Sequence, residues 1–136
     1  MSEPTGVTLR TAIKIVEAAA KRADDIGVPM NIAVVDSGNN LVAFARMDGA
    51  WLGSIDIAQN KAYTARAFDM STLDLAPLCQ PGQPLFGIQA SNEGRLIIFP
   101  GGIPLRANGA VIGAIGVSGG SVEQDQDVAQ AGAGAF

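Results

Sequence analysis

The chain has 136 residues, of which 48% are hydrophobic and 16% charged, and it contains 17 glycines. This composition predicts a single folded domain over residues 1–136 and excludes a disordered chain. The formal net charge is −4, and the lysines and arginines form no cluster of the kind that nucleic-acid binding requires, so no nucleic-acid partner is expected.

The first third of the chain predicts a helix followed by a β-hairpin. Apolar residues recur at helical spacing after Thr8, which can cap the helix, and Gly27 followed by Pro29 provides a stop. Two apolar runs, Met30–Asp36 and Leu41–Met47, flank a turn-rich segment. Neither run alternates cleanly between apolar and polar residues, so both strands are expected to be buried on both faces.

A second helix is predicted over Ser54–Phe68, directly after a turn through Asp48. Ser54 can cap its N-terminus, and Asp56 suits the positive end of the helix dipole. Lys61 falls on the apolar side of this helix. A lysine in that position either extends its stem over the core to reach solvent or places its ammonium at a pocket rim beside Asp48. Both interpretations stay open.

The segment after Phe68 is less regular. A capping serine at Ser71 predicts a short helix that reaches Leu78. Two prolines and a glycine make Cys79–Pro84 a loop, of the kind that often covers a site. Cys79 itself is interpreted as a small buried hydrophobic side chain, because the chain contains no histidine that could activate its thiol.

Three further strands are predicted, at Arg95–Phe99, Ile103–Arg106 and Ala110–Ser118. The Asn-Gly pair at residues 108–109 is a strong hairpin signal between the last two. Pro104 cannot donate a ladder hydrogen bond, which places its strand near an edge and leaves the following strand internal. With the N-terminal hairpin, these segments predict an α+β fold with one antiparallel sheet of about five strands and helices on its faces.

Two glycine-rich turns could bring backbone N–H groups close to a ligand. Gly119 and Gly120 precede a capping box at Ser121, and a helix start of this kind suits a carboxylate or phosphate. The turn at residues 100–102 also holds two glycines. Each is explained more simply as a tight turn, unless both turns and the Asp48 loop converge at one end of the sheet.

The sequence contains no histidine and one cysteine. The commonest metal ligand and general base is therefore missing, and no metal site is predicted. No stretch is long enough to cross a membrane and Met1–Gly6 has no features of an export signal, so a cytoplasmic protein without a membrane partner is expected. The high apolar and low charged content predicts a homo-oligomer.

Four stretches, Ile32–Ala50, Lys61–Ala65, Pro100–Leu105 and Ala110–Gly120, resemble the GlcG/HbpS-type haem-binding family. That family includes the C-terminal domain of the propanediol-utilisation protein PduO. The resemblance extends over nearly the whole chain. It implies an α+β domain with a five-stranded antiparallel sheet and helices on both faces, haem binding or degradation in some members, and assembly from dimers up to octamers.

The resemblance also carries the family's recurrent polar and glycine positions over to this chain. As ligand-binding candidates they are Arg46, Asp48, Ser54, Lys61, Gly101, Gly102, Ser118, Gly119 and Gly120. Haem is the candidate cofactor that the resemblance implies. Without histidine, its axial ligand would be Tyr63, Cys79, Lys61, a methionine or a hydroxyl group.

Two functions follow. The first is a small-molecule-binding protein for haem or another anionic organic ligand, whose carboxylates would meet Lys61, Arg46 and the glycine-rich helix start. The alternative is a small catabolic-pathway enzyme, a lyase or isomerase acting on an oxygenated organic acid or aromatic compound. In that enzyme Lys61 or Asp48 would move a proton. Both functions predict that Lys61 and Asp48 face one pocket at the end of the sheet.

Overall fold

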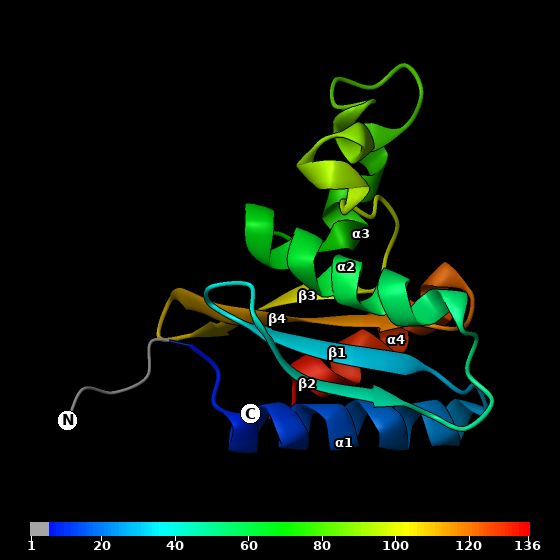
Figure 1. Cartoon of the computed structure of the whole chain (residues 1–136), viewed down its shortest axis with the longest axis vertical. Helices are drawn as coiled ribbons and strands as arrows, with labels where there is room; N and C mark the ends of the chain where they lie inside the picture. The colour runs from blue at the N-terminus through cyan, green and yellow to red at the C-terminus, as the bar shows by residue number, and fades with distance from the viewer. Residues whose placement is uncertain (1–5) are drawn as a thin grey trace.

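A computed structural model describes residues 6–136. The export-signal prediction concerned Met1–Gly6, and residues 1–5 of that segment lie outside the described part. A four-stranded antiparallel sheet carries helices on both faces (Figure 1). The elements are α1 (Leu9–Ile26), β1 (Asn31–Asp36), β2 (Leu41–Arg46), α2 (Gly53–Phe68), α3 (Thr72–Leu75), the 3-10 turns η1 (Ala76–Cys79), η2 (Ile88–Ala90) and η3 (Asn92–Gly94), β3 (Gly102–Ala107), β4 (Ala110–Ser118) and α4 (Val122–Ala133). Among residues 6–136, none of the helices has the length and apolar composition to span a bilayer.

The strands lie in the order β2–β1–β4–β3, and every neighbouring pair is antiparallel. The internal position of β4 and the edge position of β3 confirm what the Asn-Gly turn and Pro104 predicted. The sheet has four strands rather than about five, because the segment Arg95–Phe99 is not a strand. The N–H of Ile97 donates to Thr64 Oγ1 at 3.0 Å, so this backbone binds helix α2 instead of a strand.

Three of the four α-helices begin at the capping side chain that the sequence predicted. Thr8, Ser71 and Ser121 each accept a hydrogen bond from a backbone N–H in the first turn of their helix. Ser54 does not cap α2, because the helix starts one residue earlier and has no side-chain cap. Ser54 instead lies buried inside the first turn.

The two faces of the sheet are packed differently. Helices α1 and α4 cover one face over a core of larger aliphatic side chains, and α2 covers the other (Figure 1). The α2 interface consists mostly of small side chains, namely Ala33, Val35, Ala58, Ala62, Ala65 and Ala114. Small residues let the helix approach closely, and a Cβ at Gly116 would overlap the carbonyl oxygen of Ala58. The glycine in the middle of β4 is therefore required by helix packing.

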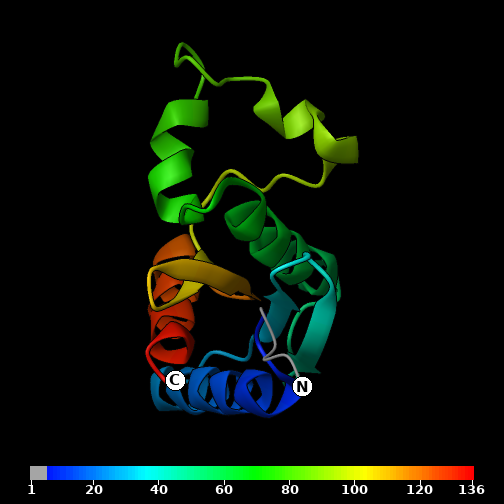
Figure 2. The same cartoon turned by 90° about the vertical axis from the view of Figure 1, so that its left-hand side faces the viewer.

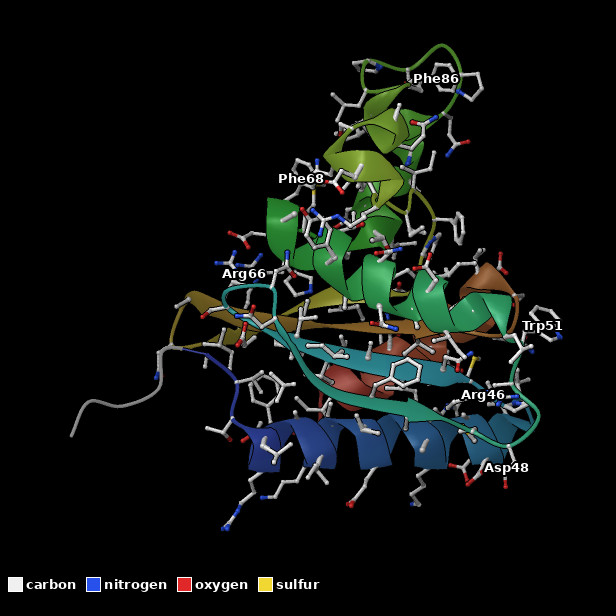
Figure 3. The ribbon with its side chains drawn as sticks, viewed as in Figure 1. Arg46, Asp48, Trp51, Arg66, Phe68 and Phe86 are labelled. Atoms are coloured by element: carbon white, nitrogen blue, oxygen red, sulfur yellow. The ribbon has the colours of Figure 1, made fainter. Side chains whose placement is uncertain are left out.

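One end of the sheet gathers the loops that the sequence singled out. Asn31, the first residue of β1, pairs with Arg46 at the end of β2 and with Ser118 at the end of β4. Gly102 begins β3 opposite Gly116, so β3 starts at the same end. The Asp48 loop and both glycine turns therefore converge there. We call this region the Arg46 end of the sheet; Arg46, Asp48 and Trp51 lie together on it in Figure 3.

The close approach of α2 to β4 gives a first prediction. Gly116→Ala should destabilise the fold by about 3 kcal/mol or more, because the new methyl group meets backbone that cannot rotate away. Gly53→Ala is the control: it lies in the first turn of the same helix with nothing within 4 Å of its added Cβ, and should change stability by no more than about 0.5 kcal/mol. Urea unfolding of both variants provides the measurement, and equal midpoints would contradict the packing argument.

Candidate functional site

Lys61 is completely buried, and its ammonium group is held inside the Arg46 end. Its Nζ donates to Asp125 Oδ2 at 2.8 Å and to the backbone oxygen of Val117 at 2.9 Å. The same atom lies 5.0 Å from the centroid of the Phe99 ring, a favourable cation–π contact. Lys61 therefore neither reaches solvent along its stem nor stands at a pocket rim, and its carboxylate partner is Asp125.

The glycine turn before α4 supports the other half of this ion pair. Asp125 Oδ2 binds Lys61, while its Oδ1 accepts a hydrogen bond from the backbone N–H of Gly120 at 2.9 Å. The preceding Gly119 has φ +155, and a Cβ there would lie 2.7 Å from the carbonyl oxygen of Pro29. This helix start does face a carboxylate, as its glycines predicted for a ligand, but the carboxylate belongs to the protein.

The glycines before β3 make room for the lysine. A Cβ on Gly101 would lie 2.7 Å from Lys61 Nζ, and one on Gly102 would overlap the Lys61 backbone oxygen. The N–H of Gly102 donates to Thr72 Oγ1 at 2.9 Å, and the N–H of Gly101 donates to Gln126 Oε1 at 3.1 Å. Both glycines are buried, so close packing of α2 against β3 accounts for their presence.

The electrostatics of the pair follow from its burial. Removal from water disfavours both charged forms, which lowers the pKa of Lys61 and raises the pKa of Asp125. The attraction between the two charges opposes each shift. A pair of this kind stabilises a fold only while both partners are present, because a single charge left behind has no compensation.

Lys61 and Asp48 do not share a pocket, so the prediction that placed them together is wrong. Asp48 lies in the turn after β2 and lines a surface hollow, whereas Lys61 is enclosed between α2, β4 and α4. The sequence offered no sign of the true partner. Asp125 lies 64 residues after Lys61 in the sequence. Its position is that of an ordinary acidic residue in the first turn of a helix.

The hollow beside Arg46 has a volume of about 570 Å³. The C-terminal half of α1, the loop after it and the end of β2 form its walls. The lining residues are Ala20, Ala23, Asp24, Gly27, Val28, Pro29, Arg46, Met47 and Asp48. Several of these are apolar, and the hollow also carries one guanidinium, one thioether and two carboxylates.

The opposite side of the same end brings other candidates together. Ser118 pairs with Asn31 there, Arg46 of the hollow pairs with Asn31 from the other neighbouring strand, and Ser54 lies in the first turn of α2. Asn31 Nδ2 donates to the carbonyl of Trp51 at 3.0 Å, which also accepts from the N–H of Ser54. Asn31 is fully buried, yet its Oδ1 has no hydrogen-bond partner within residues 6–136. Sequence reasoning missed Asn31, because a single polar residue starting an apolar run gives no distinct pattern.

Comparison with known proteins gives the family. The model of the HbpS-like haem-degrading proteins matches residues 7–134. The chain belongs to the HbpS-like family. It is 46% identical over 124 residues, covering 91% of this chain and 87% of the relative, to an uncharacterised 15.0 kDa protein in the dhaT-dhaS intergenic region of Citrobacter freundii.

Two crystal structures are similar over almost the whole chain. Protein ORFY of Klebsiella pneumoniae has a TM-score of 0.93 and 43% identity, with 98% of this chain and 92% of that chain covered. A complex of PduOC with haem has a TM-score of 0.92 and 36% identity, with 96% and 95% covered. The resemblance read from the four sequence motifs is confirmed at the level of the family.

The HbpS-like family raises the question of which side chain of this member could meet haem iron. Cys79 and Lys61 are fully buried. Tyr63 donates its hydroxyl to Asn92 Oδ1 at 2.9 Å and is stacked against Arg95. Of the side chains named from the sequence, the thioether of Met47 is the one that lines the hollow. The residues of the hollow therefore fit haem through a methionine sulfur and a carboxylate-binding arginine.

The buried pair gives a second prediction. Lys61→Met should lower the free energy of unfolding by about 3–5 kcal/mol, because it leaves the Asp125 carboxylate buried without a counter-charge. Adding Asp125→Asn should recover part of the loss, since an amide oxygen can still accept from Gly120. Lys21→Met, at an exposed position on α1, is the control. A loss below about 1 kcal/mol for Lys61→Met, measured by urea unfolding, would place Lys61 among ordinary surface lysines.

Proposed function

We propose that this chain binds haem, or another anionic organic molecule, in the hollow at the Arg46 end of the sheet. The observation that carries the proposal is the combination of apolar walls, a guanidinium and a thioether around one space of about 570 Å³. A ligand that is apolar over most of its surface and carries carboxylates matches such a lining. The structural similarity to PduOC, which has been crystallised with haem, supports the same ligand class.

Arg46 is the group that would receive a ligand carboxylate. Its Nε donates to the carbonyl of Ala50 at 3.2 Å, which directs the side chain and leaves the two terminal nitrogens for a carboxylate. Asp24 and Asp48 line the same hollow and repel an anion. The carboxylates of a ligand would therefore point toward Arg46, with the apolar part against Ala20 and Pro29.

Met47 is the group that would meet the iron of haem. Its sulfur accepts a long hydrogen bond from the backbone N–H of Met30, at 3.4 Å, which positions the side chain at the end of β2. Bound haem would supply electron-transfer or oxygen chemistry, and a methionine ligand favours its reduced form. The other family-derived candidates, such as Ser118 and Gly120, would contribute by fixing the strand ends around the hollow.

The alternative of a lyase or isomerase gains no supporting observation. Its proton transfer needs Lys61 or Asp48 to face a substrate, but the ammonium of Lys61 is fully buried and donates to Asp125 and Val117. Asp48 lines the hollow together with Asp24, and no side-chain hydrogen bond among residues 6–136 orients either carboxylate for proton transfer. Ligand binding is therefore the function that this geometry supports best.

A haem titration followed by the Soret absorption tests the proposal. Wild-type protein should give a saturable shift, with quenching of the single tryptophan, Trp51, which lies at the same end. Met47→Leu should keep the fold but alter the position of the Soret band, because the iron loses its sulfur ligand. Arg46→Gln should weaken binding about tenfold, as expected for one charge-assisted hydrogen bond of roughly 1.5 kcal/mol.

The control for the methionine is Met70→Leu, just beyond the far end of α2. It should leave both the spectrum and the affinity unchanged. Absence of a saturable shift in the wild type would exclude haem. An unchanged spectrum in Met47→Leu, with binding retained, would exclude Met47 as the ligand.

A further inference from the structure

On the side that faces α2, the Arg46 end of the sheet carries a row of polar side chains. Asn31 is directly paired with Arg46 on β2 and with Ser118 on β4, and directly paired residues of neighbouring strands point to the same face of a sheet. Asn31 shares its face with Ala33, which packs against α2. Figures 1 and 2 show α2 on one face of the sheet and α1 on the other. The row of Arg46, Asn31 and Ser118 therefore faces α2.

The first turn of α2 covers this row. Gly116 of β4 is packed against the backbone of Ala58 in α2. Two residues after Gly116, Ser118 points to the same face of β4. One helical turn before Ala58, Ser54 lies at the same end of the contact. Both serines are buried, so two hydroxyl groups lie with Asn31 at the N-terminal end of α2.

Side chains of the row hold two consecutive carbonyls of the loop before α2. Arg46 Nε donates to the carbonyl of Ala50 at 3.2 Å, and Asn31 Nδ2 donates to the carbonyl of Trp51 at 3.0 Å. The Trp51 carbonyl also accepts from the N–H of Ser54 at 3.2 Å. Arg46, Asn31 and Ser54 therefore lie against the same short piece of backbone.

Asn31 presents an acceptor that these contacts do not use. Its side chain is fully buried, and its Oδ1 has no hydrogen-bond partner within residues 6–136. A buried amide oxygen without a donor destabilises a fold, because it has lost its hydrogen bonds to water. A donor brought by a ligand removes this cost.

The charges around Asn31 select the kind of donor. Arg46 is a permanent cation, and the positive end of the α2 dipole lies at Ser54. Both repel an ammonium group but not a neutral hydroxyl. Asp56, in the same turn, is exposed and accepts from Asn60 Nδ2 at 3.0 Å, so its charge faces solvent.

The same positive features attract a carboxylate to this place. Helix α2 has no side-chain cap, so no carboxylate of the chain takes that position. Arg46 and Asn31 are directly opposite each other on neighbouring strands, which places their Cβ atoms about 5 Å apart. A ligand that reaches both therefore carries its hydroxyl close to its carboxylate.

We infer that this side of the Arg46 end binds a small 2-hydroxycarboxylate, with the carboxylate on Arg46 and the hydroxyl donating to Asn31 Oδ1. The hydroxyls of Ser54 and Ser118 donate to the remaining ligand oxygens. Trp51 is 65% exposed, so the loop over the site is held mainly through its backbone and can lift to admit the ligand. The inference rests on the proposed function in one respect, that Arg46 receives a carboxylate; Arg46 borders both the hollow and this site.

Two matched carboxylates test the site. Lactate carries a hydroxyl next to its carboxylate, and propanoate is the same molecule without that hydroxyl. Titrations are followed by ligand-observed NMR and by the fluorescence of Trp51, the single tryptophan, whose carbonyl is bound by Asn31. Lactate should bind at least about tenfold more tightly than propanoate, because propanoate leaves Asn31 Oδ1 unpaired. The free amino acid alanine, with an ammonium in place of the hydroxyl, should bind no better than propanoate.

Variants locate the preference. Asn31→Ala should abolish the preference for lactate over propanoate, and a looser loop does not imitate this result because it weakens both ligands alike. Ser118→Ala, a small change that keeps the fold, should weaken lactate binding about threefold or more. Ser91→Ala, at an exposed serine outside the sheet, is the matched control and should change neither affinity.

The outcomes separate this inference from the proposed function. Absence of lactate binding, equal affinities for lactate and propanoate, or a lactate preference that survives both Asn31→Ala and Ser118→Ala would overturn the inference and leave Asn31 Oδ1 to a bound water molecule. If the proposed function is wrong about Arg46, Arg46→Gln leaves the affinity for both carboxylates unchanged. If only the inference is wrong, Arg46→Gln weakens both and neither is preferred.

Discussion

The structure depends on the burial of one lysine. Lys61 brings a positive charge into the interior, and the chain compensates it with Asp125, a backbone carbonyl and an aromatic face. Apolar residues of similar volume often stabilise a fold as well as a buried ion pair does. The pair does, however, specify position: it ties α2 to the end of β4 and to α4. Gly101 and Gly120, which the sequence singles out as ligand loops, are both explained by it.

At the Arg46 end, the buried residues that hold the fold together and the residues of the hollow that a ligand could reach lie on different sides of the sheet. On the enclosed side, between α2 and α4, the ion pair is buried, with Lys61 0% and Asp125 3% exposed. The hollow on the α1 side has open space and keeps Arg46, Met47 and Asp48 available to solvent molecules and ligands. The family's recurrent positions thus divide into residues that fix the strand ends and residues that line the hollow.

The fold was predictable from the sequence because its signals are local. Helix caps at Thr8 and Ser121, the Asn-Gly turn and Pro104 determine helix limits and strand order without information from distant residues. The predictions that failed were those that depend on contacts between residues far apart in the sequence. The apolar run Arg95–Phe99 resembles a strand until its backbone is seen to bind α2. Likewise, nothing near Lys61 indicates a partner 64 residues away, so the nearest carboxylate in sequence, Asp48, was assigned wrongly.

Lysine acetylation of the native protein, read by mass spectrometry, tests the central claim most directly. The chain has three lysines, and Lys14 and Lys21 are exposed on α1 while Lys61 is enclosed. Brief treatment with an amine-reactive reagent should modify Lys14 and Lys21 fully and leave Lys61 unmodified until the protein is unfolded. Modification of Lys61 at a rate similar to that of Lys14 and Lys21 in the folded protein would contradict the buried ion pair.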